Sequence, residues 1–189
     1  ESTDEINGAL FEAYENLKLK AQIARDKKAP KQIDYLAESL EKLAPVVKET
    51  GVQLALENLP TWEAIPTELE AEKLMKRFHA AGFRLWWDIG HAQIRENLGF
   101  INAARWLRRL APYIAGMHVH DVVPPGQDHV MPPAGKVDFP ALAEIARMDM
   151  VRVLEPAPDT ATDQIVRAIE YLRATWTLTE SKTPSGEKK

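Results

Sequence analysis

Four residues with carboxylate or imidazole side chains stand at the ends of four short apolar runs of the sequence. They are Glu57, Asp88, His118 and Glu155, and successive members lie 31, 30 and 37 residues apart. Three carboxylates and one imidazole can form an octahedral or near-octahedral site for Mg²⁺, Mn²⁺ or a similar ion, with positions left for water and substrate. A single acid in such a place is more often a helix cap or an ion-pair partner. Four at successive run ends are hard to explain by capping alone, so the sequence predicts a divalent-metal site.

The apolar runs that lead to these residues predict short buried strands. The runs cover residues 52–56, 83–87, 113–118 and 150–154. Their spacing is close to the roughly 31 residues that each β/α unit takes in a barrel of eight units. Because the carboxyl ends of parallel strands meet at one rim, the four candidate ligands are expected to converge there. The pattern therefore predicts an α/β fold with four β/α units.

Amphipathic helices are expected before, between and after these runs. Thr67 and Glu70 have the spacing of a capping box at the start of one helix, and Gly82 closes that helix. Two helices are expected before the first run, one ending at 26–30 and one, bent at Pro45, that stops before the first strand. Further helices are expected over about 100–111, 139–148 and 165–176.

The segments around the four candidate ligands are similar to motifs of a known superfamily. They read LALEN over 54–58, WDIGH over 87–91, MHVHD over 117–121 and VLE over 153–155. Together they resemble the xylose-isomerase-like TIM barrel superfamily, which holds sugar phosphate isomerases and epimerases, inosose dehydratases and apurinic endonucleases of the family 2 type. The resemblance runs from about residue 52 to 172. It implies that Glu57, Asp88, His118 and Glu155 are metal ligands and that His91 binds a substrate oxygen or a further metal.

The resemblance also implies a place for this chain in a (β/α)8 TIM barrel. The matched strands correspond to strands five to eight of a complete barrel, and only two helices precede them here. About 100 residues with four earlier strands are thus expected elsewhere. The chain is then either part of a longer protein or a half-barrel that pairs with another chain, such as a second copy of itself. We expect one partial barrel domain over 1–178 and a disordered polar tail over 179–189.

The loop over 127–139 resembles a family segment in which an Asp, any residue and a His precede a Gly-x-Gly turn. His129 fits this pattern, but Gln127 stands where Asp is usual and Pro133 replaces the first Gly. These departures weaken the case for a full three-metal site.

Substrate contacts are expected from four residues near the predicted rim, which are Trp62, His91, His120 and His129. The ring of Trp62 could form a wall of a sugar pocket, because aromatic faces pack against the apolar side of a sugar ring. An alternative for His120 is to orient a metal ligand as its hydrogen-bond partner. An alternative for His129 is to order its own loop together with Asp128.

The predicted ligands and the resemblance together indicate a divalent-metal-dependent sugar or sugar-phosphate isomerase or epimerase that acts on a sugar or polyol. Mn²⁺, Mg²⁺, Co²⁺ or Zn²⁺ would stabilise an enediolate while Glu57 or Glu155 removes the proton next to the carbonyl. The alternatives are an inosose dehydratase-like lyase, an apurinic endonuclease-like phosphodiesterase and a non-catalytic barrel fragment. The endonuclease would require an intact Asp-x-His in the loop and a basic face.

The composition narrows the class of protein and its partners. The 189 residues are 45% apolar and 28% charged, carry a formal net charge of −4 and include no Cys. The lack of Cys excludes disulfides and a cysteine nucleophile, and it fits a reducing compartment, so we expect a cytoplasmic protein. The negative charge argues against broad binding to nucleic acid, which depends on clustered Lys and Arg. No apolar run approaches the roughly 18 residues that cross a bilayer, so no membrane partner is expected.

Overall fold

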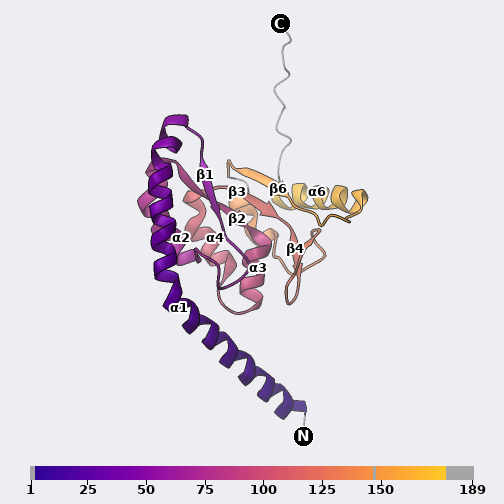
Figure 1. Ribbon diagram of the computed structural model, residues 1–189. Coiled ribbons are helices and arrows are strands. Elements are labelled where there is room, and N and C mark those ends of the chain that lie inside the picture. The colour runs from indigo at the N-terminus through magenta and orange to yellow at the C-terminus, as the bar shows by residue number, and fades with distance from the viewer. Residues whose placement is uncertain (1–2, 147, 178–189) are drawn as a thin grey trace. The chain divides into compact units, whose positions relative to one another are not determined.

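The computed structural model describes residues 3–146 and 148–177 (Figure 1). The chain divides into two compact units, Glu1–Trp86 and Trp87–Lys189. The polar tail expected over 179–189 lies outside the described residues. The single barrel domain expected over 1–178 stays a prediction. Among the described residues, no helix has both the length and the apolar character that crossing a membrane requires.

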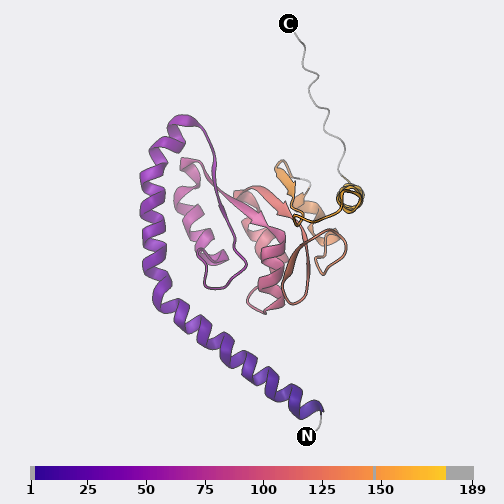
Figure 2. The ribbon, with the colours of Figure 1, turned by 45° about the vertical axis from the view of Figure 1, so that its right-hand side comes forward.

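The first unit begins with one long helix, α1, which spans Thr3–Thr50. The expectation of two helices separated at 26–30 is wrong, because α1 continues through both Pro30 and Pro45. A proline removes one backbone hydrogen bond and bends a helix, but the bonds on either side can carry the helix onward. Figures 1 and 2 show α1 bending along its length. Buried side chains in its second half, such as Leu40, hold the helix to its unit.

Two parallel strands and a second helix complete the first unit. They are β1 (Leu54–Glu57), α2 (Glu68–Phe78), the 3-10 helix η1 (His79–Ala81) and β2 (Phe83–Asp88), whose last two residues belong to the second unit. β1 pairs with β2 in parallel, with Leu54 opposite Phe83 and Glu57 opposite Trp86. The strands predicted at 52–56 and 83–87 are confirmed.

The ends of the α2 segment follow the sequence signals. The side chain of Thr67 accepts a hydrogen bond from the Glu70 N–H, and the Glu70 carboxylate accepts one from the Thr67 N–H, so the predicted capping box is confirmed. Gly82 follows η1 with a φ of 101°, and a Cβ at this position would lie 2.7 Å from Cγ1 of Val47. Both the backbone conformation and the close approach of α1 therefore favour glycine.

Arg25 of α1 forms hydrogen bonds with the connection between β1 and α2 and with Glu70 of α2. Its guanidinium is buried and donates to both carboxylate oxygens of Glu70, at 2.9 and 2.5 Å. It also donates to the carbonyl oxygens of Trp62 and Ala64, at 2.9 and 3.3 Å, and lies 5.6 Å from the centre of the Trp62 ring. The structure thus gives the Trp62 ring a packing partner in the first unit, while its contact with substrate stays a prediction.

Replacing Glu70 with glutamine should destabilise the protein at neutral pH by about 2 kcal/mol, because buried Arg25 loses its counter-charge. Burial alone would raise the pKa of Glu70, but the hydrogen bond from Arg25, the Thr67 N–H and the Arg25 charge outweigh it and lower the pKa below 4.5. A lowered folded-state pKa gives stability that is complete above the unfolded-state pKa and is lost as the pH falls through the folded-state pKa. Urea unfolding should therefore show a difference between the two proteins at pH 7 that shrinks below about pH 4. Glu63→Gln, at an exposed position of the same connection, serves as the control; a difference that persists unchanged into acid would contradict the charge-based explanation.

The second unit continues the alternation of helices and strands. Its elements are α3 (Ile89–Asn97), α4 (Ala103–Leu110), η2 (Ala111–Tyr113), β3 (Ile114–Val119), β4 (Asp121–Val123), β5 (Gln127–Val130), η3 (Pro140–Leu142), α5 (Ala143–Ala146), β6 (Val151–Leu154) and α6 (Thr162–Trp176). The helices expected near 100–111, 139–148 and 165–176 correspond to α4, to η3 with α5, and to α6. Helix α3 was not expected from the sequence.

Strands β3 and β6 form the parallel pair of the second unit. Val119 lies opposite Leu154 in register, which confirms the strands predicted at 113–118 and 150–154. The Glu155 N–H donates to the Val119 carbonyl at 3.1 Å and so extends the ladder by one residue. The backbone therefore fixes Glu155 beside the carboxyl end of β3.

Strands β4 and β5 form an antiparallel pair where the sequence predicted only a loop. Asp121 lies opposite Val130 and Val123 opposite Gln127, with an irregularity between the two pairs. We name residues 121–130 the hairpin. Helix α3 packs against β3 and against both strands of the hairpin.

Candidate metal centre

Strand ends of the second unit position three of the four predicted metal ligands. Asp88 is the last residue of β2 and also caps α3, because its Oδ1 accepts the His91 N–H at 2.7 Å. His118 lies one residue before the end of β3, and Glu155 directly follows β6. The Asp88 side chain is fully buried, whereas those of His118 and Glu155 are 24% and 36% exposed. Solvent therefore cannot reach Asp88, but it can reach His118 and Glu155.

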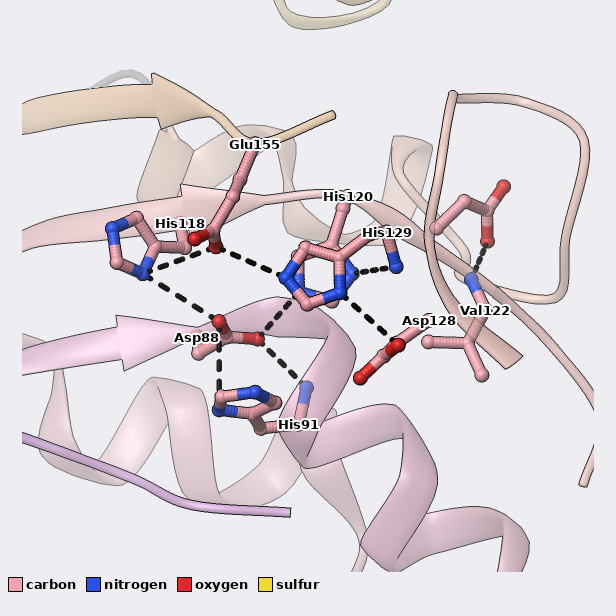
Figure 3. Close-up of polar contacts among 9 residues, drawn as sticks. Asp88, His91, His118, His120, Val122, Asp128, His129 and Glu155 are labelled. Atoms are coloured by element: carbon pink, nitrogen blue, oxygen red, sulfur yellow. Dashed lines mark hydrogen bonds and ion pairs between the residues drawn. The ribbon is translucent and has the colours of Figure 1, made fainter. Parts of the chain in front are cut away.

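The imidazole of His118 lies close to the carboxylates of both Asp88 and Glu155 (Figure 3). Nδ1 of His118 lies 3.6 Å from Oδ2 of Asp88 and 3.4 Å from Oε2 of Glu155. Two ligand atoms that each lie about 2.0–2.6 Å from one ion would be separated by distances of this order. Two carboxylates and one imidazole suit Mg²⁺, Mn²⁺, Co²⁺ or Zn²⁺. The residues present therefore fit a divalent ion.

Glu57, the fourth predicted ligand, belongs to the first unit. It is the half-buried last residue of β1 and lies opposite Trp86 in the register of the parallel pair. This is the strand-end position that the sequence predicted, and the metal-binding role of Glu57 stays a prediction.

His120 is buried between Asp88 and the hairpin. Its Nε2 lies 3.0 Å from Oδ1 of Asp88, and its Nδ1 accepts the His129 N–H at 3.0 Å. In the neutral ring the proton is then on Nε2 and faces the Asp88 carboxylate, as in the carboxylate–histidine pairs that orient metal ligands. The His120 side chain has no exposed surface. This geometry favours the orienting role over the substrate contact that the sequence also predicted.

Asp88 and His120 each favour the charged form of the other. Burial would raise the pKa of Asp88, but the hydrogen bond with His120 and the charges of His120 and His91 together lower it below its ordinary value. Burial would lower the pKa of His120, but the contact with Asp88 outweighs burial and raises it. Asp88 therefore remains a carboxylate, which is the form that binds a cation.

His91 and His129 flank the group formed by Asp88, His118 and Glu155, which we name the cluster. Nδ1 of His91 lies 3.5 Å from Oδ2 of Asp88. On the other side, Nε2 of His129 lies 3.7 Å from Oε2 of Glu155, and its Nδ1 lies 3.0 Å from Oδ1 of Asp128. Both histidines thus reach the edge of the cluster, and their contact with substrate stays a prediction.

A cavity of about 530 Å³ adjoins this cluster in the second unit. It is lined by residues 127–134 of β5 and the following loop and by Ala157, Asp159, Thr160, Gln164 and Arg167 on the other side. His129 belongs both to the cavity lining and to the cluster. The volume lies within the range usual for small-molecule sites.

The sequence analysis did not predict the roles of two residues of the site, Gly90 and Asp121. Gly90 lies against the ring of His120, so closely that a Cβ would overlap it. Asp121 is almost fully buried and accepts N–H bonds from Val122, Gly135 and Val137. Gly90 stands two residues after Asp88 and Asp121 directly follows His120, and these positions are the sequence signal for the two roles.

Comparisons with known proteins agree with the fold. The D-tagatose 3-epimerase-like protein superposes with a TM-score of 0.65 at 21% identity, covering 80% of this chain and 57% of that one. The D-psicose 3-epimerase of Clostridium cellulolyticum H10 gives 0.61 at 18% identity, with 76% and 56% covered. The probable 3-DHS dehydratase of Bacillus anthracis gives 0.56 at 14% identity, with 79% and 57% covered. These likenesses show a shared fold.

The sequence itself shows the family. An uncharacterized protein of Methanocaldococcus jannaschii is 23% identical over 127 residues, which are 66% of this chain and 47% of that protein. The chain thus spans about half the length of the relatives that it matches. The family model described as xylose isomerase-like TIM barrel matches residues 14–175. The chain belongs to the xylose isomerase-like TIM barrel family, and the predicted α/β fold, a partial barrel, is confirmed.

Proposed function

We propose that this chain supplies part of the active site of a divalent-metal-dependent isomerase or epimerase acting on a sugar, sugar phosphate or polyol. The observation that carries the proposal is the position of His118 near the end of β3, with its Nδ1 3.6 Å from Oδ2 of Asp88 and 3.4 Å from Oε2 of Glu155. The names of the matched epimerases support the choice of reaction class. Metal dependence is proposed from the donor set of this chain.

The proposed reaction removes a proton next to a carbonyl and passes through an enediolate. A divalent ion, when bound, would polarise the carbonyl and make this proton more acidic. Asp88, His118 and Glu155 would hold the ion, and the accessible carboxylate of Glu155 would also take or return the proton. We further propose that Glu57, at the end of β1, is the fourth ligand and serves the opposite face of the substrate. Epimerisation requires two such groups, because the proton leaves one face and returns to the other.

The substrate is proposed to lie along the cavity beside the cluster. His91 and His129 are proposed to contact its oxygen atoms, a role supported by the distances of 3.5 Å from His91 to Asp88 and 3.7 Å from His129 to Glu155. Trp62 is proposed as an apolar wall for the sugar ring. The cavity is lined by both polar and apolar residues, and the polar groups would fix the orientation of a polyol.

Glu155→Gln should weaken Mn²⁺ binding by about 100-fold while the protein stays folded, because the substitution keeps the size of the side chain but removes an anionic ligand. Calorimetric titration of metal-free protein with Mn²⁺ would measure the change, and Glu144→Gln, at an exposed position of α5, is the matched control. Proton–deuterium exchange next to the carbonyl of a panel of ketoses in D₂O, followed by NMR, then tests the reaction. Equal Mn²⁺ affinity of the wild type and Glu155→Gln would remove Glu155 from the site.

A further inference from the structure

We propose that His120 is a positioning residue that couples the metal ligand Asp88 to the hairpin, so that an ion bound at Asp88 orders His129 and the wall of the adjoining cavity. This inference rests on the proposed function and adds to it a link between the metal site and the substrate pocket. Dashed lines in Figure 3 mark the contacts of His120 with Asp88 and with the His129 N–H.

In the first step of the coupling, the His120 ring is held in one orientation by its contacts. Nε2 faces Asp88 at 3.0 Å and Nδ1 accepts the His129 N–H at 3.0 Å. The His129 ring stacks on one face of His120, with centres 4.3 Å apart and planes 5° from parallel. Gly90 presses against the ring from α3. A planar ring held on both nitrogens passes a displacement of Asp88 directly to His129.

The second step is the strained backbone that His120 supports. His129 has a φ of 54°, in the left-handed region that non-glycine residues seldom adopt. Such a conformation persists where surrounding contacts hold it. The bond from its N–H to His120 is such a contact, and the His129 carbonyl accepts the Ala157 N–H at 3.3 Å as another. Loss of the His120 bond should therefore loosen this end of the hairpin.

The third step carries the effect to the cavity. The His129 ring contacts Asp128 and approaches Glu155, and both Asp128 and His129 line the cavity of about 530 Å³. The hairpin begins at Asp121, which lies opposite Val130, and the Asp121 carboxylate accepts N–H bonds from the loop that follows β5. Asp121 thus holds strand β4 of the hairpin, while His120 holds His129 on strand β5 from the metal side of the site.

Two substitutions separate the two halves of this link. His120→Gln can place an amide nitrogen near the position of Nε2 and so keep a donor for Asp88, but it offers no acceptor for the His129 N–H. His120→Asn can place its oxygen near the position of Nδ1 and keep that acceptor, but it is too short to reach Asp88. Gln127→Ala, at an exposed position of β5, is the control that leaves both contacts intact.

The experiment combines Mn²⁺ titration calorimetry with amide hydrogen exchange of the hairpin, measured by mass spectrometry with and without Mn²⁺ on the full chain. In the wild type and in Gln127→Ala, Mn²⁺ should slow exchange of the hairpin about tenfold. His120→Gln should keep its Mn²⁺ affinity within about threefold, but its hairpin should exchange fast with or without the ion. His120→Asn should lose about tenfold in Mn²⁺ affinity, with slow hairpin exchange that no longer responds to the ion.

The outcomes distinguish this inference from the proposed function. If the wild type binds Mn²⁺ but its hairpin exchange does not change, the coupling is overturned and the metal site stands. If both variants retain a hairpin that responds to Mn²⁺ as the wild type does, His120 is not the link and the inference is overturned. If the wild type binds no divalent ion, the proposed function fails and the coupling fails with it.

Discussion

Gly90→Ala is expected to destabilise the protein by about 1–3 kcal/mol and to weaken Mn²⁺ binding about tenfold, although neither Gly90 nor alanine is a ligand. Gly90 is the second residue of α3, where alanine would ordinarily stabilise a helix by up to about 1 kcal/mol. Here the added Cβ would overlap Cε1 and Nδ1 of His120. The ring has no room to withdraw, because His129 stacks on it and Asp88 holds its edge.

Urea unfolding and Mn²⁺ titration would measure both effects. Gly126→Ala is the matched control: Gly126 precedes β5, its φ is not positive, and a Cβ there would meet only Ile94 at 4.0 Å. In the double variant Gly90→Ala, His120→Ala the space left by the ring should make the alanine at 90 harmless, so the two effects should not add. Stability of Gly90→Ala equal to that of Gly126→Ala would refute the steric argument.

The strands and their ends could be predicted from the sequence because both depend on local pattern. A short apolar run bounded by polar residues indicates a buried strand, and parallel pairing brings carboxyl ends to one rim. Glu57, Asp88, His118 and Glu155 were therefore expected to converge. The structure places His118 within 3.6 Å of Asp88 and 3.4 Å of Glu155, and the shared metal site stays a prediction. The capping box of Thr67 and Glu70 was equally local, since each group contacts the other three residues away.

The elements that the sequence did not reveal depend on contacts distant in the chain. Helix α1 continues through Pro30 because its buried side chains are held by the rest of its unit, a contribution that a local breaker rule does not include. Helix α3 starts directly after Asp88, whose carboxylate caps it. The Asp88 side chain is thus both a predicted metal ligand and the cap of a helix. The hairpin strands are too short for alternation to be recognised.

Asp121 explains why the hairpin forms without such a pattern. Its side chain is 1% exposed, and its carboxylate accepts three backbone N–H bonds: Oδ1 from Val122 at 2.8 Å and from Val137 at 3.0 Å, and Oδ2 from Gly135 at 2.7 Å. These bonds join the start of β4 to the loop after β5. One side chain, buried with its negative charge satisfied by N–H groups, thus replaces much of the ladder that longer strands would provide.

Asp121→Asn should therefore cost about 2–4 kcal/mol of stability, although the two side chains have nearly the same shape. An amide has only one oxygen, so in either orientation its NH₂ group must face at least one backbone N–H that loses its acceptor in a buried place. Asp138→Asn is the control, because exposed Asp138 accepts a single N–H bond, from Ala141 at 3.1 Å, which an asparagine oxygen can still accept. Urea unfolding gives the free-energy difference, and faster amide exchange over 134–137 would place the loosening at the loop that Asp121 holds. Equal stability of Asp121→Asn and Asp138→Asn would show that the hairpin is held by its ladder, and the charge at Asp121 would then need no role in fixing the loop that lines the cavity.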